Sequence, residues 1–128
     1  MSDIYQEHIL DHYSNPRNRG VIESADIYFR DSNPLCGDEI AAYALVDGKK
    51  IKKSSFLASG CAISQAAASM LSEEIEGKYV QNVEKMSASD VVSMLGIELS
   101  PTRLKCALLA LKTLQAGIAI YRRKNGTT

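Results

Sequence analysis

The sequence contains few of the residues that cross-link small domains or form aromatic cores. Its 128 residues include three cysteines, three prolines, two phenylalanines and no tryptophan. A domain of this length buries roughly two-thirds of the surface of its unfolded chain, so it does not need disulfides to fold. Three is also an odd number of thiols. In a cytoplasmic protein, the expected uses of such cysteines are metal binding and thiol chemistry.

An excess of charge of either sign is absent as well. Fifteen lysines and arginines balance fifteen aspartates and glutamates. No basic tract is dense enough to bind a phosphate backbone, so nucleic acid is not a predicted partner. No apolar run approaches the ~18 residues of a membrane span, and the first residues are polar. We therefore predict a cytoplasmic protein without a membrane segment.

The composition that remains is that of one globular domain. Hydrophobic residues make up 45% of the chain and charged residues 23%, a balance typical of folded soluble proteins. The sequence shows no internal repeat and no linker. We therefore predict a single domain over residues 1–128.

One helix followed by three strands is predicted for the first half of the chain. Apolar and polar residues alternate around Ile27 and Phe29, as in a half-buried strand. The dipeptide Asp47-Gly48 predicts a two-residue hairpin in which both turn residues have positive φ. The predicted elements are a helix from Ser2 or Asp3 to about Tyr13 and strands at residues 40–46 and 51–57, besides the one at 26–30.

Helices are predicted for the second half. The alanine-rich run that follows Cys61 favours a helix closed by Gly77. Ser87 and Asp90 have the spacing of a capping box for a short helix, and Pro101 is typical of the first turn of a long helix that ends near residue 124. A helix, three strands and then helices predict an α+β fold, with helices packed on one face of a small three-stranded antiparallel sheet.

The three thiols fall near the ends of predicted elements. Cys36 precedes the second strand, Cys61 lies at a strand-to-helix junction, and Cys106 lies in the second turn of the last helix. At 100° per residue, Cys106 falls about 200° from Leu104, off the main apolar stripe. This placement predicts an accessible thiol. Glycines beside the first two cysteines leave room for a bulky ligand.

The residues alone leave the chemistry of these thiols open. A helix N-terminus favours the thiolate of Cys61 by less than one pKa unit, whereas coordination to a metal deprotonates a thiol outright. No C-x-x-C pair is present. A metal or cluster site, a sulfur-carrying or redox thiol, and unrelated structural cysteines are all compatible with this spacing. Asp38 is either a ligand beside Cys36 or a turn residue that leads into a strand.

Two histidines offer a second candidate site. His8 and His12 are spaced i, i+4 on the first predicted helix, which would let one zinc ion contact both. Glu7 precedes the pair instead of standing between them, so the H-E-x-x-H motif is absent. Surface or packing roles for the two imidazoles are the alternative.

Four segments together resemble one protein family. "YQEHILDHYSNPRNRG", "NPLCGDEI", "GCAISQAAASML" and "LKCALLALKTL" occur in this order over nearly the whole chain. They are similar to the N-terminal helix and the three ligand segments of the IscU-like iron-sulfur cluster assembly scaffolds, a family that includes the NifU N-terminal domain and SufU.

The resemblance implies a set of site residues and a function. Cys36, Cys61 and Cys106 match the family's cluster-ligand cysteines, and Asp38 matches an aspartate that influences cluster release or acts as a ligand. The implied function is a non-enzymatic scaffold that builds a [2Fe-2S] cluster from iron and sulfur. A cysteine desulfurase would supply the sulfur, and acceptor proteins would receive the cluster. If sulfur is accepted as a persulfide, Cys106 is the first candidate and Cys36 the second.

Three departures from the family define the alternatives. Lys105 stands where the best-known members have histidine, and its two expected roles are to steady a thiolate or persulfide or to be a solvated lysine. SufU proteins also have lysine there, which makes a zinc-containing sulfurtransferase the second hypothesis, but this chain lacks their insertion between the second and third cysteines. "LSPTR", residues 99–103, replaces the proline-rich segment read by a dedicated Hsp70-type chaperone, so that partner is not predicted. A structural zinc domain is the third hypothesis, and a homodimer is left open.

Overall fold

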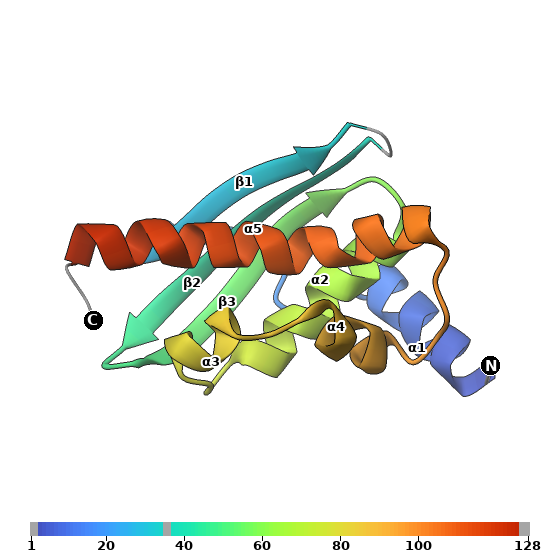
Figure 1. Cartoon of the computed structure of the whole chain (residues 1–128), viewed down its shortest axis with the longest axis horizontal. Helices are drawn as coiled ribbons and strands as arrows, with labels where there is room; N and C mark the ends of the chain where they lie inside the picture. Colours follow the sequence, from blue (N-terminus) through green and yellow to red (C-terminus); the bar gives the residue numbers. More distant parts are fainter. Residues whose placement is uncertain (1–2, 35–36, 126–128) are drawn as a thin grey trace.

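The protein has the α+β architecture that the sequence predicts (Figure 1). The computed structural model describes residues 3–34 and 37–125. Helix α3 is the element that the sequence did not predict, because it has five residues and Tyr79 at its N-cap makes no side-chain capping bond. The described elements are α1 (Asp3–Ser14), β1 (Ile27–Asn33), β2 (Asp38–Asp47), β3 (Lys50–Ser59), α2 (Ala62–Ile75), α3 (Val80–Glu84), α4 (Ala88–Leu95) and α5 (Pro101–Asn125).

The three strands form one antiparallel sheet in the order β1-β2-β3. Asp47 pairs with Lys50, so the two residues between β2 and β3 are Gly48 and Lys49. Gly48 has φ +66°, and Lys49 is not among the described non-glycine residues with positive φ. The hairpin is therefore confirmed, but its two turn residues lie one position later than the predicted Asp47-Gly48, and the prediction of two positive-φ positions was wrong. A glycine at the first position alone has the pattern of a type II′ turn.

Two loops cover the outer edge of β3. The Gly20 N–H donates to Phe56 O at 2.9 Å, and the Ile51 N–H donates to Lys78 O at 2.8 Å. An uncovered strand edge would offer these groups to another chain. The bonds instead anchor the segment after α1 and the segment after α2 to the sheet.

Helices α5 and α2 cover one face of the sheet, with α5 lying across the strands (Figure 1). Small side chains allow this close approach: Ala42 and Ala44 are buried on β2. A Cβ added to Gly117 of α5 would lie 3.0 Å from Ile27 Cγ2. Helices α1 and α4 pack in turn against α2 and α5. The core therefore lies between one face of the sheet and the helices.

Helix α5 corrects the expectation that no segment is apolar enough to cross a membrane. Its span Pro101–Lys124 meets that test by length and composition, with a mean hydropathy of 1.3, and 50% of the window is buried inside the fold. The core helix of a soluble protein meets the same test. Because α5 packs along the sheet and carries core residues such as Leu111, Leu114 and Ile118, we assign it as the central core helix.

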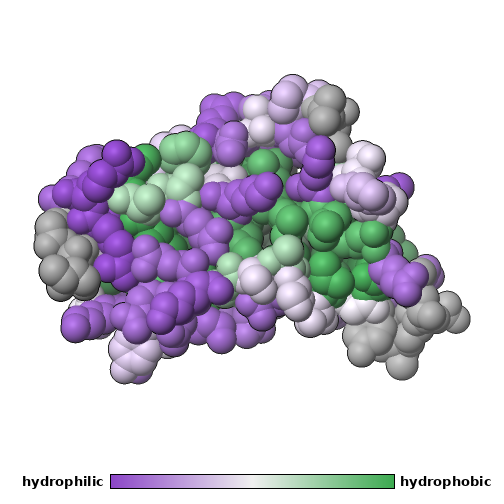
Figure 2. All heavy atoms as spheres, in the orientation of Figure 1, coloured by the Kyte–Doolittle hydropathy of each residue, from purple (hydrophilic) through white to green (hydrophobic). Residues whose placement is uncertain are grey.

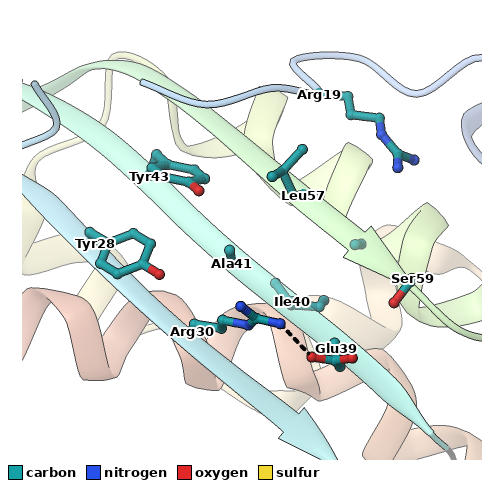
Figure 3. A pocket seen from close by; sticks show the side chains of 10 residues that line it. Arg19, Tyr28, Arg30, Glu39, Ile40, Ala41, Tyr43, Leu57 and Ser59 are labelled. Carbon is teal, nitrogen blue, oxygen red and sulfur yellow. Dashed lines mark hydrogen bonds and ion pairs between the residues drawn. The ribbon is translucent and has the colours of Figure 1, made fainter. Parts of the chain in front are cut away.

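Among residues 3–34 and 37–125, no helix packs on the other face of the sheet. Tyr28, Arg30, Tyr43 and Leu57 lie along a shallow hollow of about 310 Å³ (Figure 3). Arg30 Nη2 pairs with Glu39 Oε1 at 2.8 Å across β1 and β2. On the helical face, hydrophobic residues gather around the N-terminal half of α5, while hydrophilic residues cover its C-terminal half and α3 (Figure 2). The N-terminal half is the part of α5 that contains Cys106.

Candidate metal and cluster site

Asp38 is placed by the turn between β1 and β2. It is the first residue of β2 and pairs with Asn33 at the end of β1. Gly37 precedes it with φ +72°, and the Gly37 N–H donates to Asn33 O at 2.9 Å. The Asp38 side chain is 0% exposed. Asp38 therefore follows a turn and leads into a strand, as one of the two sequence interpretations had it, but its side chain turns inward at the end of the sheet.

Gly60 brings the end of β3 against this buried carboxylate. It has φ +119°, and a Cβ at this position would lie 2.8 Å from Asp38 Cα and closer still to Oδ1. No L-residue fits there without displacing Asp38. The sequence suggested that Gly60 makes room for a ligand. The structure shows that it makes room for the backbone and side chain of Asp38.

The next residue, Cys61, binds Asp38 through its backbone. The Cys61 N–H donates to Asp38 Oδ1 at 2.7 Å. Cys61 is also the N-cap of α2, with an extended backbone and no side-chain capping bond, and its thiol faces Asp38 and Ser64. Its Sγ lies 3.6 Å from Asp38 Oδ2 and 3.8 Å from Ser64 Oγ. Ser64, three residues further along α2, is a neighbour of the thiol that the sequence analysis did not single out.

Cys106 joins this pair from the second turn of α5. The ligand atoms of Asp38, Cys61 and Cys106 all lie within 4.8 Å of one another. Three segments that are distant in the sequence thus meet at one end of the molecule. Among the described residues this is the one group of three such side chains with that spacing.

The predicted accessibility of Cys106 was wrong. Its side chain is 3% exposed, whereas Leu104 and Leu108, on the stripe expected to face the core, are half-buried. Leu109 and Thr113, which share the side of Cys106, are buried too. The reason is tertiary: α5 packs against the sheet and also against α2 and α4, so its buried surface is wider than one stripe.

Of the other residues that the sequence singled out, the structure places Lys105, His8 and His12. Cys36 lies outside the described residues, so its place relative to the other ligands is not described. Lys105 is exposed beside Cys106. The imidazoles of His8 and His12 lie on α1, where His12 is buried and bonded to Ser69 of α2.

The described donors fit a tetrahedral metal ion. At zinc, a thiolate sulfur and a carboxylate oxygen bonded at about 2.3 and 2.1 Å are separated by about 3.6 Å. Cys61 Sγ and Asp38 Oδ2 have that separation, 3.6 Å. Cys106 Sγ completes the group within 4.8 Å and would approach by roughly 1 Å on binding. Thiolates suit zinc and iron-sulfur centres alike.

Fold and site together define a class: small α+β domains that bring cysteines and an aspartate to one metal-binding position. The sequence profile of the family described as NifU-like N terminal domain matches residues 4–128. The chain belongs to this family.

Some known relatives of the chain are named as cluster assembly scaffolds, and one is named as a sulfurtransferase. The chain is 37% identical to "Iron-sulfur cluster assembly scaffold protein IscU 1" of Archaeoglobus fulgidus over 123 residues, covering 96% of this chain and 80% of the relative. It is 34% identical to "Zinc-dependent sulfurtransferase SufU" of Bacillus subtilis over 136 residues, covering 93% and 92%.

Solved structures agree with the fold. A putative SufU scaffold from Fervidobacterium islandicum is 33% identical and superposes with a TM-score of 0.75, covering 91% of this chain and 97% of that one. A NifU-like N-terminal domain from Brucella abortus gives a TM-score of 0.77 at 18% identity, with 95% and 96% covered. The second likeness concerns the fold alone.

Proposed function

We propose that this protein is a scaffold on which an iron-sulfur cluster of the [2Fe-2S] type is assembled and from which it is passed on. The observation that carries the proposal is the convergence of Asp38, Cys61 and Cys106 within 4.8 Å in a chain of this family. The cluster is the cargo of such a protein. A scaffold needs no catalytic residue, and we assign none.

Each ligand has a separate structural role in this proposal. Cys61 and Cys106 supply thiolates from the start of α2 and from α5. Asp38 supplies a carboxylate that is oriented by the Cys61 N–H bond. Cys36 is the proposed fourth ligand, on the basis of the family motif alone. Carboxylate oxygen is a harder donor than thiolate and suits iron-sulfur centres less well, so Asp38 is the ligand that can yield when the cluster leaves.

Sulfur delivery requires a desulfurase partner. In the proposed step, a thiolate of this chain attacks the outer sulfur of the desulfurase persulfide, and the desulfurase thiolate leaves. Cys106, next to the cation of Lys105, and Cys36 remain the candidate acceptors. Because Cys106 is buried, its role as acceptor requires local opening at the start of α5. We also propose acceptor proteins for the cluster and a cytoplasmic location, without a dedicated Hsp70-type chaperone or nucleic acid.

The second candidate is a zinc-containing sulfurtransferase. It is favoured by Lys105 and by the similarity to the SufU relative. The alignment with SufU runs over 136 residues, more than the 128 of this chain, so SufU has residues without a counterpart here. The IscU scaffolds of Thermotoga maritima and Haemophilus influenzae also align over more than 128 residues, so the length of the alignment does not separate the two candidates.

Anaerobic reconstitution with cysteine, ferrous iron and a cysteine desulfurase tests the proposal. We expect a sulfide-containing chromophore that moves to an apo-ferredoxin when the two are mixed. Cys61→Ala should lose the chromophore, whereas Ser59→Ala, two residues away and not a ligand, should keep it. Sulfur acceptance with bound zinc, and no cluster in any condition, would replace the scaffold by the sulfurtransferase.

The structural zinc domain makes a different prediction. It requires Cys106→Ser to unfold the chain, because the metal would then supply the folding free energy. The scaffold has a core of its own, so we expect this variant to keep its far-UV circular dichroism and a cooperative thermal transition while it loses metal.

A further inference from the structure

Two histidines and a glutamate lie between α1 and α2, without the close spacing of the cysteine site. His8 and His12 are one turn apart on α1, and their ring centroids are 4.6 Å apart with the rings edge to face. Glu73 approaches from α2, with Oε1 3.8 Å from His12 Nε2. A shallow surface hollow of about 340 Å³ is lined by these three residues together with Met70, Glu74 and Met94.

His12 is held in place for this arrangement. It is 2% exposed, and its Nδ1 lies 2.7 Å from Ser69 Oγ, which also accepts the Arg17 N–H at 2.9 Å. A serine oxygen has two lone pairs, so it can accept the Nδ1 proton as well. In that tautomer, Nε2 carries a free lone pair on the side of Glu73. Metal-binding histidines are usually oriented in this way by a bond at the other ring nitrogen.

The distance to Glu73 suits a metal better than a direct bond. At 3.8 Å, His12 Nε2 and Glu73 Oε1 are too far apart for a hydrogen bond. Nitrogen and oxygen ligands of one tetrahedral metal are separated by about 3.4 Å. A shift of a few tenths of an ångström would let both contact one ion. His8 and Glu73 are exposed and can adjust their rotamers, while His12 stays fixed.

We propose that His8, His12 and Glu73 bind one divalent first-row transition-metal cation such as Fe²⁺ or Zn²⁺. Two imidazoles and one carboxylate with open positions are a ligand set that these cations accept, and it contains no thiolate. The site is separate from the cysteine site. Glu73 lies twelve residues beyond Cys61 on α2, about 18 Å along the helix axis. The proposal is independent of whether the protein is a scaffold.

Nuclear magnetic resonance can test this site directly, because the chain has two histidines and both belong to it. Zinc is added to the full-length protein in two stages: one equivalent to occupy the cysteine site, then a titration in which the imidazole carbon-bound protons are followed. We expect both imidazoles to shift together and to saturate. His8→Gln and Glu73→Gln should each weaken this binding at least tenfold. Glu7→Gln, the same charge change on an exposed residue of α1, should change it less than twofold.

Three results would overturn the proposal. The first is no imidazole shift at a tenfold excess of zinc. The second is a shift of His8 alone, which would indicate a single surface imidazole. The third is a joint shift that Glu73→Gln leaves unchanged. The cysteine site is followed separately, by the thiolate-to-metal charge-transfer absorption of Co²⁺. A failure of the histidine site is thereby distinguished from a failure of the cysteine site.

Discussion

The side chain of Asp38 does two things at once, and substitutions can separate them. It accepts the Cys61 N–H at 2.7 Å and faces the thiol with its second oxygen. Asp38→Ala leaves a buried N–H without its acceptor and should lower the free energy of unfolding by about 1–3 kcal/mol. Asp38→Asn keeps an acceptor and should cost less. Both should weaken zinc binding at least about tenfold, since even the loss of a hydrogen-bond partner of a metal ligand has that effect. Urea unfolding and zinc titration measure the two effects, and a metal affinity unchanged in both variants would contradict the ligand assignment.

Gly60 should tolerate no side chain. Gly60→Ala would place Cβ 2.8 Å from Asp38 Cα at φ +119°. Strain of about 1–3 kcal/mol is expected from the backbone alone, with displacement of Asp38 in addition. Gly48→Ala is the matched control, because φ is also positive there, +66°, and nothing lies within 4 Å of the added Cβ. Both variants should lose thermal stability, but only Gly60→Ala should lose metal affinity. Equal metal affinities would show that the Asp38 contact is not required.

His12 should make stability depend on pH. Burial lowers its pKa below the ordinary value, the charges of Arg17 and His8 act in the same direction, and Glu73 and Asp11 oppose them. In the unfolded chain a histidine binds a proton below about pH 6.5, whereas folded His12 remains neutral to a lower pH. The unfolded state then holds more protons, so stability falls as pH drops below 6.5. With metals removed by a chelator, His12→Gln should reduce this slope between pH 7.5 and 5.5 more than His8→Gln does. Equal slopes in the two variants would contradict the assignment of this pH dependence to His12.

At the scale of the elements, the capping box of α4 was predictable from four residues of sequence. Asp90 Oδ2 accepts the Ser87 N–H at 2.8 Å and the Ser87 hydroxyl at 3.3 Å, and Gly96 ends the helix with φ +73°. Asp90→Ala should therefore cost about 1 kcal/mol in the free energy of unfolding. Ser89→Ala, in the same exposed first turn, should change it by less than about 0.5 kcal/mol. Equal effects of the two substitutions in urea unfolding would show that the box does not stabilise α4.

Other features of the elements could not be predicted because they depend on packing. The periodicity of α5 indicated its length, but not that it is buried on two sides, so Cys106 was expected to be exposed. The need for Gly60 arises only once β3 runs beside the start of β2. By contrast, the strands, the long helices and the identity of Asp38, Cys61 and Cys106 as candidates followed from alternation, caps and motifs. Ser64 would have been found by asking which side chain lies one turn after Cys61.

At the scale of the whole molecule, bound metal should add to stability without being required for folding. The chain has a continuous core between the sheet and the helices, so the apoprotein should unfold cooperatively. At a free zinc concentration one hundred times its Kd, binding should add about 2.7 kcal/mol to the free energy of unfolding. Binding of zinc to the thiols of the unfolded chain reduces this gain. Cys106→Ala should abolish the part of this gain that arises at the cysteine site. Calorimetry with and without a chelator measures the difference, and complete unfolding in chelator would favour a structural zinc domain.

The measurement that tests the central claim most directly is the iron, zinc and acid-labile sulfide content per chain after strictly anaerobic purification. The scaffold account predicts iron with a matching amount of sulfide, lost together in Cys61→Ala and in Cys106→Ala. About one zinc per chain without sulfide, even after incubation with a desulfurase, cysteine and ferrous iron, would contradict it and favour sulfur transfer.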